Sequence, residues 1–306
     1  MKHLFIVNPV SGGSDKTEEV TAKVREIFRD RDDAYEIYVT KAPMDAPVKV
    51  REEAAKEDYL RVYACGGDGT FNECVCGGAM LPNVAICPFP TGTGNDFCRM
   101  FGEESSLYRD LNALVNGSEH LIDLIDCNGR YSANICSVGI DARIGCEVHT
   151  YSSLPLVGGA SAYVISATVN LFKGISRKMR VKCDDFVAEG PHTLVCACNG
   201  RYYGGGFNPS LDARPDDGKL DIFIVRKVSM FLFAALIGKY AKGAAASMPK
   251  YVTHMISDNV EIEFDEDNVI NLDGEAMYGK KIRMQLVPKA MKLIVPVGMK
   301  FFEEQE

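Results

Sequence analysis

The amino-acid sequence predicts two domains, an α/β domain with a parallel sheet and flanking helices, followed by an antiparallel β-sandwich domain. The chain has 306 residues, and because domains usually hold roughly 100 to 200 residues, this length favours two of them. Up to residue 125, short apolar runs alternate with amphipathic helical stretches, which indicates parallel strands joined by crossover helices. Beyond residue 125 the pattern changes to alternating strands separated by turns, which is typical of antiparallel sandwiches.

In the first half, each predicted strand is a short apolar run and each predicted helix carries apolar residues at helical spacing. The first helix has Val20, Val24, Ile27 and Phe28 on one face. The other helices are expected over 46–56 and from residue 71, and the strands over 3–8, 35–40, 60–65 and 84–87.

In the second half, the predicted strands alternate apolar and polar residues and are bounded by turn residues. They are expected over 131–137, 179–183, 193–199, 220–225, 260–264, 269–272, 281–286 and 292–295. Helices are expected over 160–172 and 228–242. These patterns place the first domain at 1–125 and the second at 126–295, and leave a tail, 296–306, that can return to the first domain.

Composition excludes several classes of protein. With 34 basic and 42 acidic residues the net charge is -8, which disfavours binding to polyanionic nucleic acid. The cysteines number 11, an odd set without a Cys-x-x-Cys pair, which argues against disulfides and zinc modules. The first apolar run, 4–7, is too short for a signal peptide, and the longest apolar stretch, 228–246, is interrupted by Lys239 and Lys242. We therefore expect a cytoplasmic protein without a transmembrane segment.

Three glycine-rich turns in the first half follow predicted strands. Their sequences are NPVSGG at 8–13, GGDGT at 66–70 and PTGTGND at 90–96. The carboxyl ends of parallel strands are the edge where open α/β sheets bind ligands, and glycine lets the backbone approach a phosphate closely. Neither a P-loop nor a Rossmann fingerprint occurs. The turns therefore predict a polyphosphate ligand, and Asp68 beside it requires a cation such as Mg²⁺ in between.

GGDGT at 66–70 together with PTGTGNDF at 90–97 resembles the catalytic domain of the diacylglycerol kinase family of lipid kinases, especially its soluble bacterial members. GGDGT alone is shared with NAD kinases, so the GTGNDF element is the discriminating one. Further matches, in the order of the family, are NPVSGG, GASAY at 159–163, NGRYYGGGFNPSLDARPDDGKLD at 199–221 and LDGEAM at 272–277. The resemblance covers nearly the whole chain and implies an ATP-binding α/β domain followed by a β-sandwich domain for a lipid substrate.

The resemblance also implies which residues surround ATP. They are Asn8, Ser11, Gly12, Thr40, Gly66, Gly67, Asp68, Gly69, Thr70, Phe71, Asn72 and Thr93.

The stretch 199–221 implies a bound Mg²⁺, held by the Asp217 carboxylate and by the backbone carbonyls of Arg214 and Lys219. The family usually has a small or apolar residue where Arg214 stands, although only its carbonyl is needed. An ordinary hairpin turn is the alternative interpretation of this Asp-Asp-Gly-Lys segment.

The Asp-Gly-Glu segment 273–275 matches the catalytic motif of the family and, with Asp68, supplies the catalytic carboxylates. If the segment is extended, Asp273 and Glu275 point to the same face. Glutamate reaches about one methylene further, so Glu275 is assigned as the base for the lipid hydroxyl and Asp273 as an orienting or metal-side partner. The reverse order stays open, as does an ordinary acidic turn.

The predicted function is ATP-dependent phosphorylation of a lipid hydroxyl with Mg²⁺, most simply of diacylglycerol to phosphatidic acid. The alternatives are a kinase for a sphingoid base, ceramide or phosphatidylglycerol, a soluble-substrate kinase of the NAD kinase type, and a non-catalytic binding protein. The expected partner is a lipid at the membrane surface, contacted peripherally, and a homodimer is left open. Two segments are candidates for that contact, the basic tract 173–182 and the apolar helix 228–242, although a solvated strand and a core helix are their structural interpretations.

Overall fold

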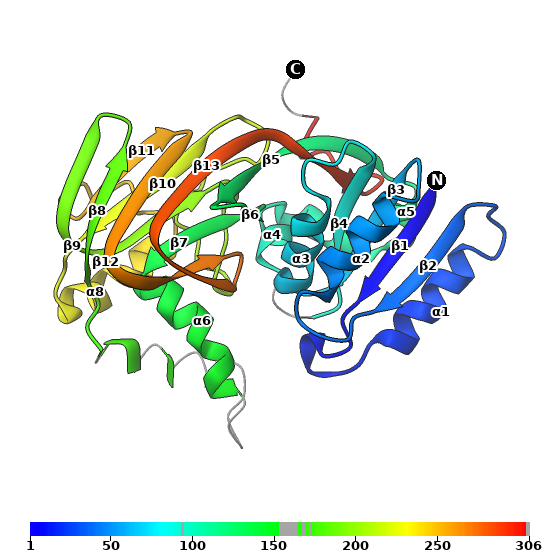
Figure 1. The fold of residues 1–306 in the computed structure, drawn as a ribbon, viewed down its shortest axis with the longest axis horizontal. Coiled ribbons are helices and arrows are strands. Elements are labelled where there is room, and N and C mark those ends of the chain that lie inside the picture. The colour runs from blue at the N-terminus through cyan, green and yellow to red at the C-terminus, as the bar shows by residue number, and fades with distance from the viewer. Residues whose placement is uncertain (93–94, 153–164, 167–168, 172, 304–306) are drawn as a thin grey trace. The chain divides into compact units, whose positions relative to one another are not determined.

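The computed structural model describes residues 1–92, 95–152, 165–166, 169–171 and 173–303 (Figure 1). The chain forms two compact units. The first comprises Met1–Leu124 and Pro288–Glu306, and the second comprises Ile125–Val287. The chain leaves the first unit within strand β5 (Ser118–Cys127) and returns to it within strand β13 (Glu275–Val295).

The first unit contains a parallel sheet in the order β4-β3-β1-β2. The strands are β1 (Lys2–Val7), β2 (Ala34–Val39), β3 (Leu60–Gly66) and β4 (Val84–Pro90). All residues of β3 and β4 are buried, as expected for strands covered on both faces. The parallel α/β architecture predicted from the sequence is confirmed.

Helices connect these strands. The longer ones are α1 (Thr17–Ile27), α2 (Asp45–Ala54) and α3 (Asp68–Gly78), and the short ones are η1 (Ser11–Gly13), α4 (Asp96–Arg99), η2 (Gly102–Arg109) and α5 (Leu111–Val115). Val20 and Val24 of α1 are buried, as their spacing predicts.

The strand order creates a switch point in this sheet. From β1 the chain adds β2 on one side, and then returns to add β3 and β4 on the other side. Ligands of open α/β sheets bind outside the carboxyl ends of the strands where the order reverses, which here are β1 and β3. The loops NPVSGG and GGDGT follow these two strands (Figure 1).

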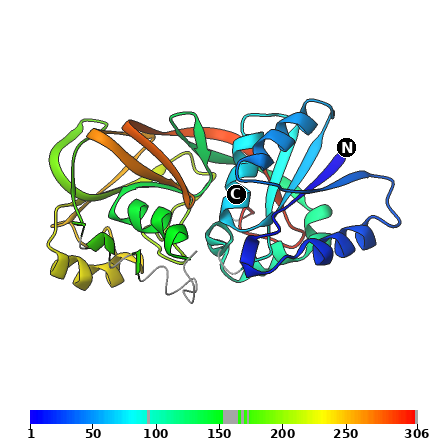
Figure 2. The same cartoon turned by 60° about the horizontal axis from the view of Figure 1, so that its bottom comes forward.

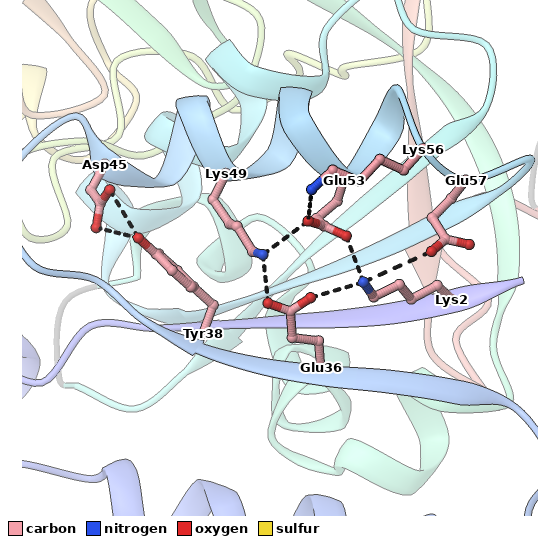
Figure 3. A network of polar contacts seen from close by, with 8 residues as sticks. All are labelled: Lys2, Glu36, Tyr38, Asp45, Lys49, Glu53, Lys56 and Glu57. Carbon is pink, nitrogen blue, oxygen red and sulfur yellow. Dashed lines mark hydrogen bonds and ion pairs between the residues drawn. The ribbon is translucent and has the colours of Figure 1, made fainter.

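A network of ion pairs ties α2 to the edge of this sheet (Figure 3). At its centre the Glu53 carboxylate accepts hydrogen bonds from Lys2, Lys49 and Lys56 at 2.5, 2.9 and 2.8 Å. Burial alone raises the pKa of Glu53, but the three lysine hydrogen bonds outweigh it and lower the pKa to about 2. Glu53 therefore stays ionised and holds the helix on the sheet.

The second unit is built from antiparallel strands in the order β11-β10-β9-β7-β12-β13, with β8 pairing to both β9 and β12; Figure 1 labels these strands. The strands are β6 (Arg130–Ser132), β7 (Ile135–Gly139), β8 (Arg177–Cys183), β9 (Phe186–Cys198), β10 (Leu220–Arg226), β11 (Val252–Ser257) and β12 (Asn259–Leu272). Helices α6 (Ile140–Ser152) and α8 (Met230–Tyr240) belong to this unit, and residues 165–166 and 169–171 are also helical. No helix among the described residues is long and apolar enough to cross a membrane.

Alternate residues of β9 enter two different cores. Val195 and Ala197 lie in one cluster with residues of β8 and β12, whereas Leu194 and Cys196 lie in the other with Tyr240 of α8. This alternation is the period of two expected for a strand with both faces covered.

Two expectations from the sequence differ from the structure, and a third is not tested by it. Segment 292–295 belongs to the first unit, because Lys292 and Leu293 pair with Ala85 and Ile86 of β4 in parallel. The predicted strand 131–137 is two strands, because the backbone of residues 133–135 turns toward Asp273. Most of the predicted helix 160–172, and the GASAY segment, lie outside the described residues.

Candidate active site

The three glycine-rich loops of the first unit contact one another at the switch point. Asn8 Nδ2 donates a hydrogen bond to Thr70 Oγ1 at 3.0 Å, which joins the loop after β1 to the first turn of α3. The backbone N–H of Thr91 donates to the carbonyl of Gly66 at 3.1 Å, which joins the loop after β4 to the end of β3. The structure therefore brings together the loops that the sequence singled out.

Two glycines make this close packing possible. Gly12 has φ +73°, and a Cβ there would lie 2.9 Å from the Gly92 Cα. A Cβ on Gly66 would collide with the Thr70 side chain, which receives the Asn8 hydrogen bond. A larger residue at either position would collide with these neighbours. The close packing of the loops, which together form a cradle, therefore depends on glycine, which has no side chain.

Asp68, at the start of α3, has a structural role that its position in the glycine turn did not indicate. Its carboxylate accepts hydrogen bonds from the backbone N–H groups of Asp96 and Phe97 at 3.0 and 3.4 Å. These are the first residues of α4, directly after the PTGTGN loop. Asp68 therefore orients the third loop from the second.

The remaining residues assigned to ATP are distributed around these loops. Ser11 N–H donates to the Asn8 carbonyl at 3.3 Å, and Thr40 N–H donates to the Val7 carbonyl at 2.9 Å, which places Thr40 beyond the end of β2. Gly67 precedes α3 and Gly69 lies in its first turn.

Two of the assigned side chains point into the core instead. Phe71 is buried against Phe97, with ring centroids 4.8 Å apart, and Asn72 is fully buried. Neither side chain is exposed to solvent. Thr93 lies outside the described residues.

In the second unit, Asp273 and Gly274 form the two-residue turn of a hairpin. Leu272 of β12 pairs with Glu275 of β13, and the central residues have φ +51° and +99°. Positive φ at both positions is the type I′ geometry that Asp-Gly favours. The segment is therefore not extended, and the expectation that Asp273 and Glu275 point to one face does not apply.

The Asp273 carboxylate is surrounded by donors from the segment between β6 and β7. Ser132 Oγ donates to it at 2.6 Å, and the backbone N–H groups of Ala133, Asn134 and Ile135 donate at 2.9, 3.2 and 2.9 Å. These charge-assisted bonds fix both the carboxylate and the segment that surrounds it.

Glu275 is in a different situation. Its side chain is half-buried and forms no hydrogen bond or ion pair with any residue that the structure describes. Its carboxylate is therefore available to an incoming hydroxyl, whereas that of Asp273 is occupied by the fold.

The Asp217 loop presents oxygen ligands around a tight turn. Lys219 N–H donates to Asp217 Oδ1 at 3.1 Å, and Gly218 has φ +72°. The Arg214 guanidinium binds both oxygens of Asp216, at 3.1 and 3.3 Å. One carboxylate with backbone carbonyls is a hard-oxygen set that fits Mg²⁺. Among the described residues, no three His, Cys, Asp or Glu side chains gather around one point.

The sequence analysis missed Asp141, in the first turn of α6. Both of its carboxylate oxygens are buried and lack a hydrogen-bond partner among the described residues. Burial raises the pKa of Asp141 to about 6, although the neighbouring Ser137 and Tyr203 hydroxyls oppose that rise. Only its position two residues after Gly139, where strand β7 is followed by α6, distinguishes it in the sequence.

Comparison with family models agrees with this architecture. The model described as the diacylglycerol kinase catalytic domain matches residues 2–127. The model described as the YegS C-terminal NAD kinase beta sandwich-like domain matches residues 134–295, about half of the chain. The predicted sandwich class of the second domain is thereby confirmed.

Individual relatives and structures point the same way. A Pseudomonas aeruginosa protein named probable lipid kinase YegS-like is 28% identical over 306 residues, covering 99% of this chain and 97% of the relative. A Staphylococcus epidermidis protein named diacylglycerol kinase is 29% identical over 246 residues, covering 80% of this chain and 76% of the relative. The crystal structure of a diacylglycerol kinase candidate from Bacillus anthracis superposes with a TM-score of 0.74 at 26% identity, covering 97% of each chain. Yeast NADH kinase shares the fold, with a TM-score of 0.50 at 11% identity.

Proposed function

This chain belongs to the diacylglycerol kinase family and is a lipid kinase, and we propose that it transfers the γ-phosphate of ATP to the free hydroxyl of diacylglycerol, giving phosphatidic acid. The observation that carries the proposal is the meeting of three glycine-rich loops at the switch point of a parallel sheet. Phosphoryl transfer demands positioning and neutralisation of charge more than covalent chemistry, and such a cradle supplies positioning.

The nucleotide belongs, in this proposal, to the loops after β1, β3 and β4. Gly12, Gly66 and Gly92 let backbone N–H groups approach phosphate oxygens, because no Cβ intervenes. Asn8 and Thr70 hold two of the loops at a constant distance. Asp68 keeps the third loop in place through Asp96 and Phe97.

Glu275 acts as the base. An alcohol is a poor nucleophile near neutral pH, so a carboxylate in hydrogen-bond reach of the acceptor hydroxyl takes its proton as the new P–O bond forms. Glu275 is preferred to Asp273 because the Asp273 oxygens already accept one hydroxyl and three backbone hydrogen bonds. Asp273 is then a positioning residue that fixes the hairpin carrying Glu275.

Mg²⁺ would be held by the Asp217 carboxylate with the carbonyls of Arg214 and Lys219. A bound Mg²⁺ supplies positive charge that offsets the charge of phosphate groups. The protein's own contribution is the tight turn at Gly218, which separates Asp217 from Lys219 by a single residue with positive φ.

The choice of diacylglycerol is supported by the Staphylococcus epidermidis relative, which is named diacylglycerol kinase.

A direct test incubates the purified chain with radiolabelled ATP, Mg²⁺ and one acceptor at a time. The acceptors are diacylglycerol, sphingosine, ceramide and phosphatidylglycerol in detergent micelles, and soluble NAD. We expect label in phosphatidic acid and its loss when EDTA is added. Label in another phospholipid would change the acceptor, and label in NADP would overturn the proposal.

A further inference from the structure

The outward face of α8 is apolar, although a surface helix normally exposes polar residues on that face. Phe231 is 84% exposed and Met230 is 40% exposed. The other exposed positions in the first nine residues of the helix are Ala234, Ala235 and Gly238, so no charged side chain lies there before Lys239. An aromatic ring this exposed loses favourable burial unless something covers it.

The opposite face of α8 anchors the helix to its own unit. Tyr240 is buried, and Phe233, Leu236 and Ile237 pack against the same core cluster. At the other end, Ser229 Oγ accepts a hydrogen bond from Leu232 N–H at 3.3 Å, which caps the helix. Helix α8, seen at the edge of its unit in Figure 1 and Figure 2, is therefore firmly attached, and it carries the exposed Phe231 ring.

The ionisable residues that flank α8 in the sequence are all basic or neutral at pH 7. Segment 222–257 contains no Asp or Glu, in a protein with 42 acidic residues and a net charge of -8. Lys227, Lys239, Lys242 and Lys250 are exposed, and none forms an ion pair within the part of the chain that the structure describes. An apolar helix face bordered by unpaired lysines is complementary to a bilayer that carries anionic lipids.

The second candidate from the sequence, the basic tract 173–182, has its charge compensated locally. Lys173 pairs with Glu147 at 3.0 Å, and Lys178 pairs with Asp265 at 3.5 Å. In the β8–β12 ladder, Arg180 lies opposite Glu263 and Lys182 lies opposite Glu261. Cross-strand neighbours of opposite charge stabilise the sheet, so four of the five basic residues of the tract have an acidic ion-pair partner or cross-strand neighbour.

We propose that α8 and the four lysines around it, Lys227, Lys239, Lys242 and Lys250, form the surface with which this protein docks on an anionic lipid bilayer. The inference rests on the proposed function in one respect, namely that the substrate is a membrane lipid. Phe231 and Met230 enter the boundary between headgroups and acyl chains, while the lysines contact anionic headgroups.

The test measures co-sedimentation with vesicles of phosphatidylcholine, with and without phosphatidylglycerol. Wild-type protein should bind the anionic vesicles and bind them less at high salt. Phe231→Ser and Lys239→Glu should each weaken that binding roughly tenfold. Val187→Ser and Lys178→Glu are matched controls, since Val187 is 53% exposed and Lys178 lies in the compensated tract. The controls should bind as wild type does, and Phe231→Trp should bind at least as well.

The proposed docking surface and the proposed kinase activity can be tested independently of each other. All five variants should phosphorylate diacylglycerol in detergent micelles at the wild-type rate, because micelles bring the substrate without a bilayer. Unchanged vesicle binding of Phe231→Ser and Lys239→Glu, or equal weakening by the controls, would overturn the docking surface and leave the kinase proposal intact. A wild-type protein that binds anionic vesicles but phosphorylates no lipid in micelles would overturn the proposed substrate and leave the docking surface intact.

Discussion

Asp273 and Glu275 lie two positions apart, yet the fold treats their carboxylates in opposite ways. Asp273 is buried and accepts four hydrogen bonds from residues 132–135, whereas Glu275 has no such bond among the described residues. A carboxylate with an open lone pair can accept a proton from a substrate, and one saturated with donors holds structure.

Glu275→Gln should lower kcat by roughly 10² to 10⁴ while leaving the KM for ATP and the melting temperature unchanged, because glutamine is nearly isosteric but does not accept the proton. Asp273→Asn should lower both kcat and the free energy of unfolding, the latter by about 1–3 kcal/mol, because its amide faces backbone donors. Steady-state kinetics and thermal melts of both variants separate these roles. Full activity in Glu275→Gln with loss in Asp273→Asn alone would reverse them.

Asp141 gives the protein a pH dependence of stability with a definite sign. Its folded pKa, about 6, lies above the value of 3.8 for an unperturbed aspartate. Between these values the folded state binds more protons than the unfolded state, so stability falls as pH rises through that window.

Asp141→Asn should therefore unfold like wild type at pH 4 and be more stable at pH 7.5, by up to about 3 kcal/mol, since two pKa units correspond to about 2.7 kcal/mol. Urea titrations at the two pH values measure the difference. The exposed Asp185→Asn is the control and should show no difference between them. A variant less stable than wild type at pH 7.5 would mean that the charged carboxylate has a partner that compensates its burial.

The proposed phosphate cradle is formed by loops that contact one another. The loop after β1 meets the loop after β4 at Gly12 and Gly92, and it meets α3 at Thr70. Each loop is shaped by its neighbour, so a change in one should alter nucleotide binding by all three.

Gly12→Ala should raise the KM for ATP at least tenfold, because its Cβ would lie 2.9 Å from the Gly92 Cα. Gly13→Ala is a close control, since Gly13 has φ +78° but nothing within 4 Å of an added Cβ. Both variants should lose about 1 kcal/mol of stability from the positive φ. Initial rates measured across ATP concentrations give the KM of each variant. Equal KM values for the two variants would contradict the proposal that these loops bind ATP.

Mg²⁺ binding at the Asp217 loop should be detectable as a change in thermal stability. Mg²⁺ that binds only the native state should raise the melting temperature of wild type, by the equivalent of about 2.7 kcal/mol at 100 times its Kd. Asp217→Asn should lose that rise, whereas the nearby exposed Asp212→Asn should keep it. Melts with Mg²⁺ and with EDTA test this, and a wild-type protein insensitive to Mg²⁺ would remove the metal from the proposal.

At the scale of the whole molecule, the first unit is completed by the end of the chain. Lys300 and Phe301 N–H groups both donate to the Glu104 carboxylate at 3.1 Å. The Phe301 ring lies 4.9 Å from Phe101, and the Phe302 ring lies 4.3 Å from His120. A terminal segment of few residues therefore stabilises a unit that begins at residue 1.

Truncation after Val297 should destabilise the first unit by about 1–3 kcal/mol, since it uncovers the Phe101 ring. Hydrogen exchange should accelerate in η2, which begins beside Phe101, while β9 of the second unit keeps its wild-type rates. Equal acceleration in both units would show that the tail acts on the whole molecule and not on the unit it contacts.

Features that follow from local sequence pattern could be predicted before the structure was known. Helical and strand periodicity predicted the parallel α/β sheet and the antiparallel domain, because apolar residues must face a core at the spacing of their element. Three glycine-rich loops after strands predicted the cradle, because parallel strands bring their carboxyl ends to one edge. The motifs in those loops and at 272–277 were sufficient to identify the lipid kinase family.

Contacts between residues that are distant in the sequence became known only from the three-dimensional structure. Asp68 reaches Asp96, Asp273 reaches Ser132, and Lys292 pairs beside Ala85. The two candidate membrane segments were also separated only in three dimensions, since the partners of the basic tract, Glu147 and Asp265, are far from it in sequence. Periodicity reports which face of an element is buried. It does not report which residue packs against that face, because the partner comes from a segment distant in the sequence. The packing of distant segments therefore decides which charges are paired and which hydrogen bonds are already made.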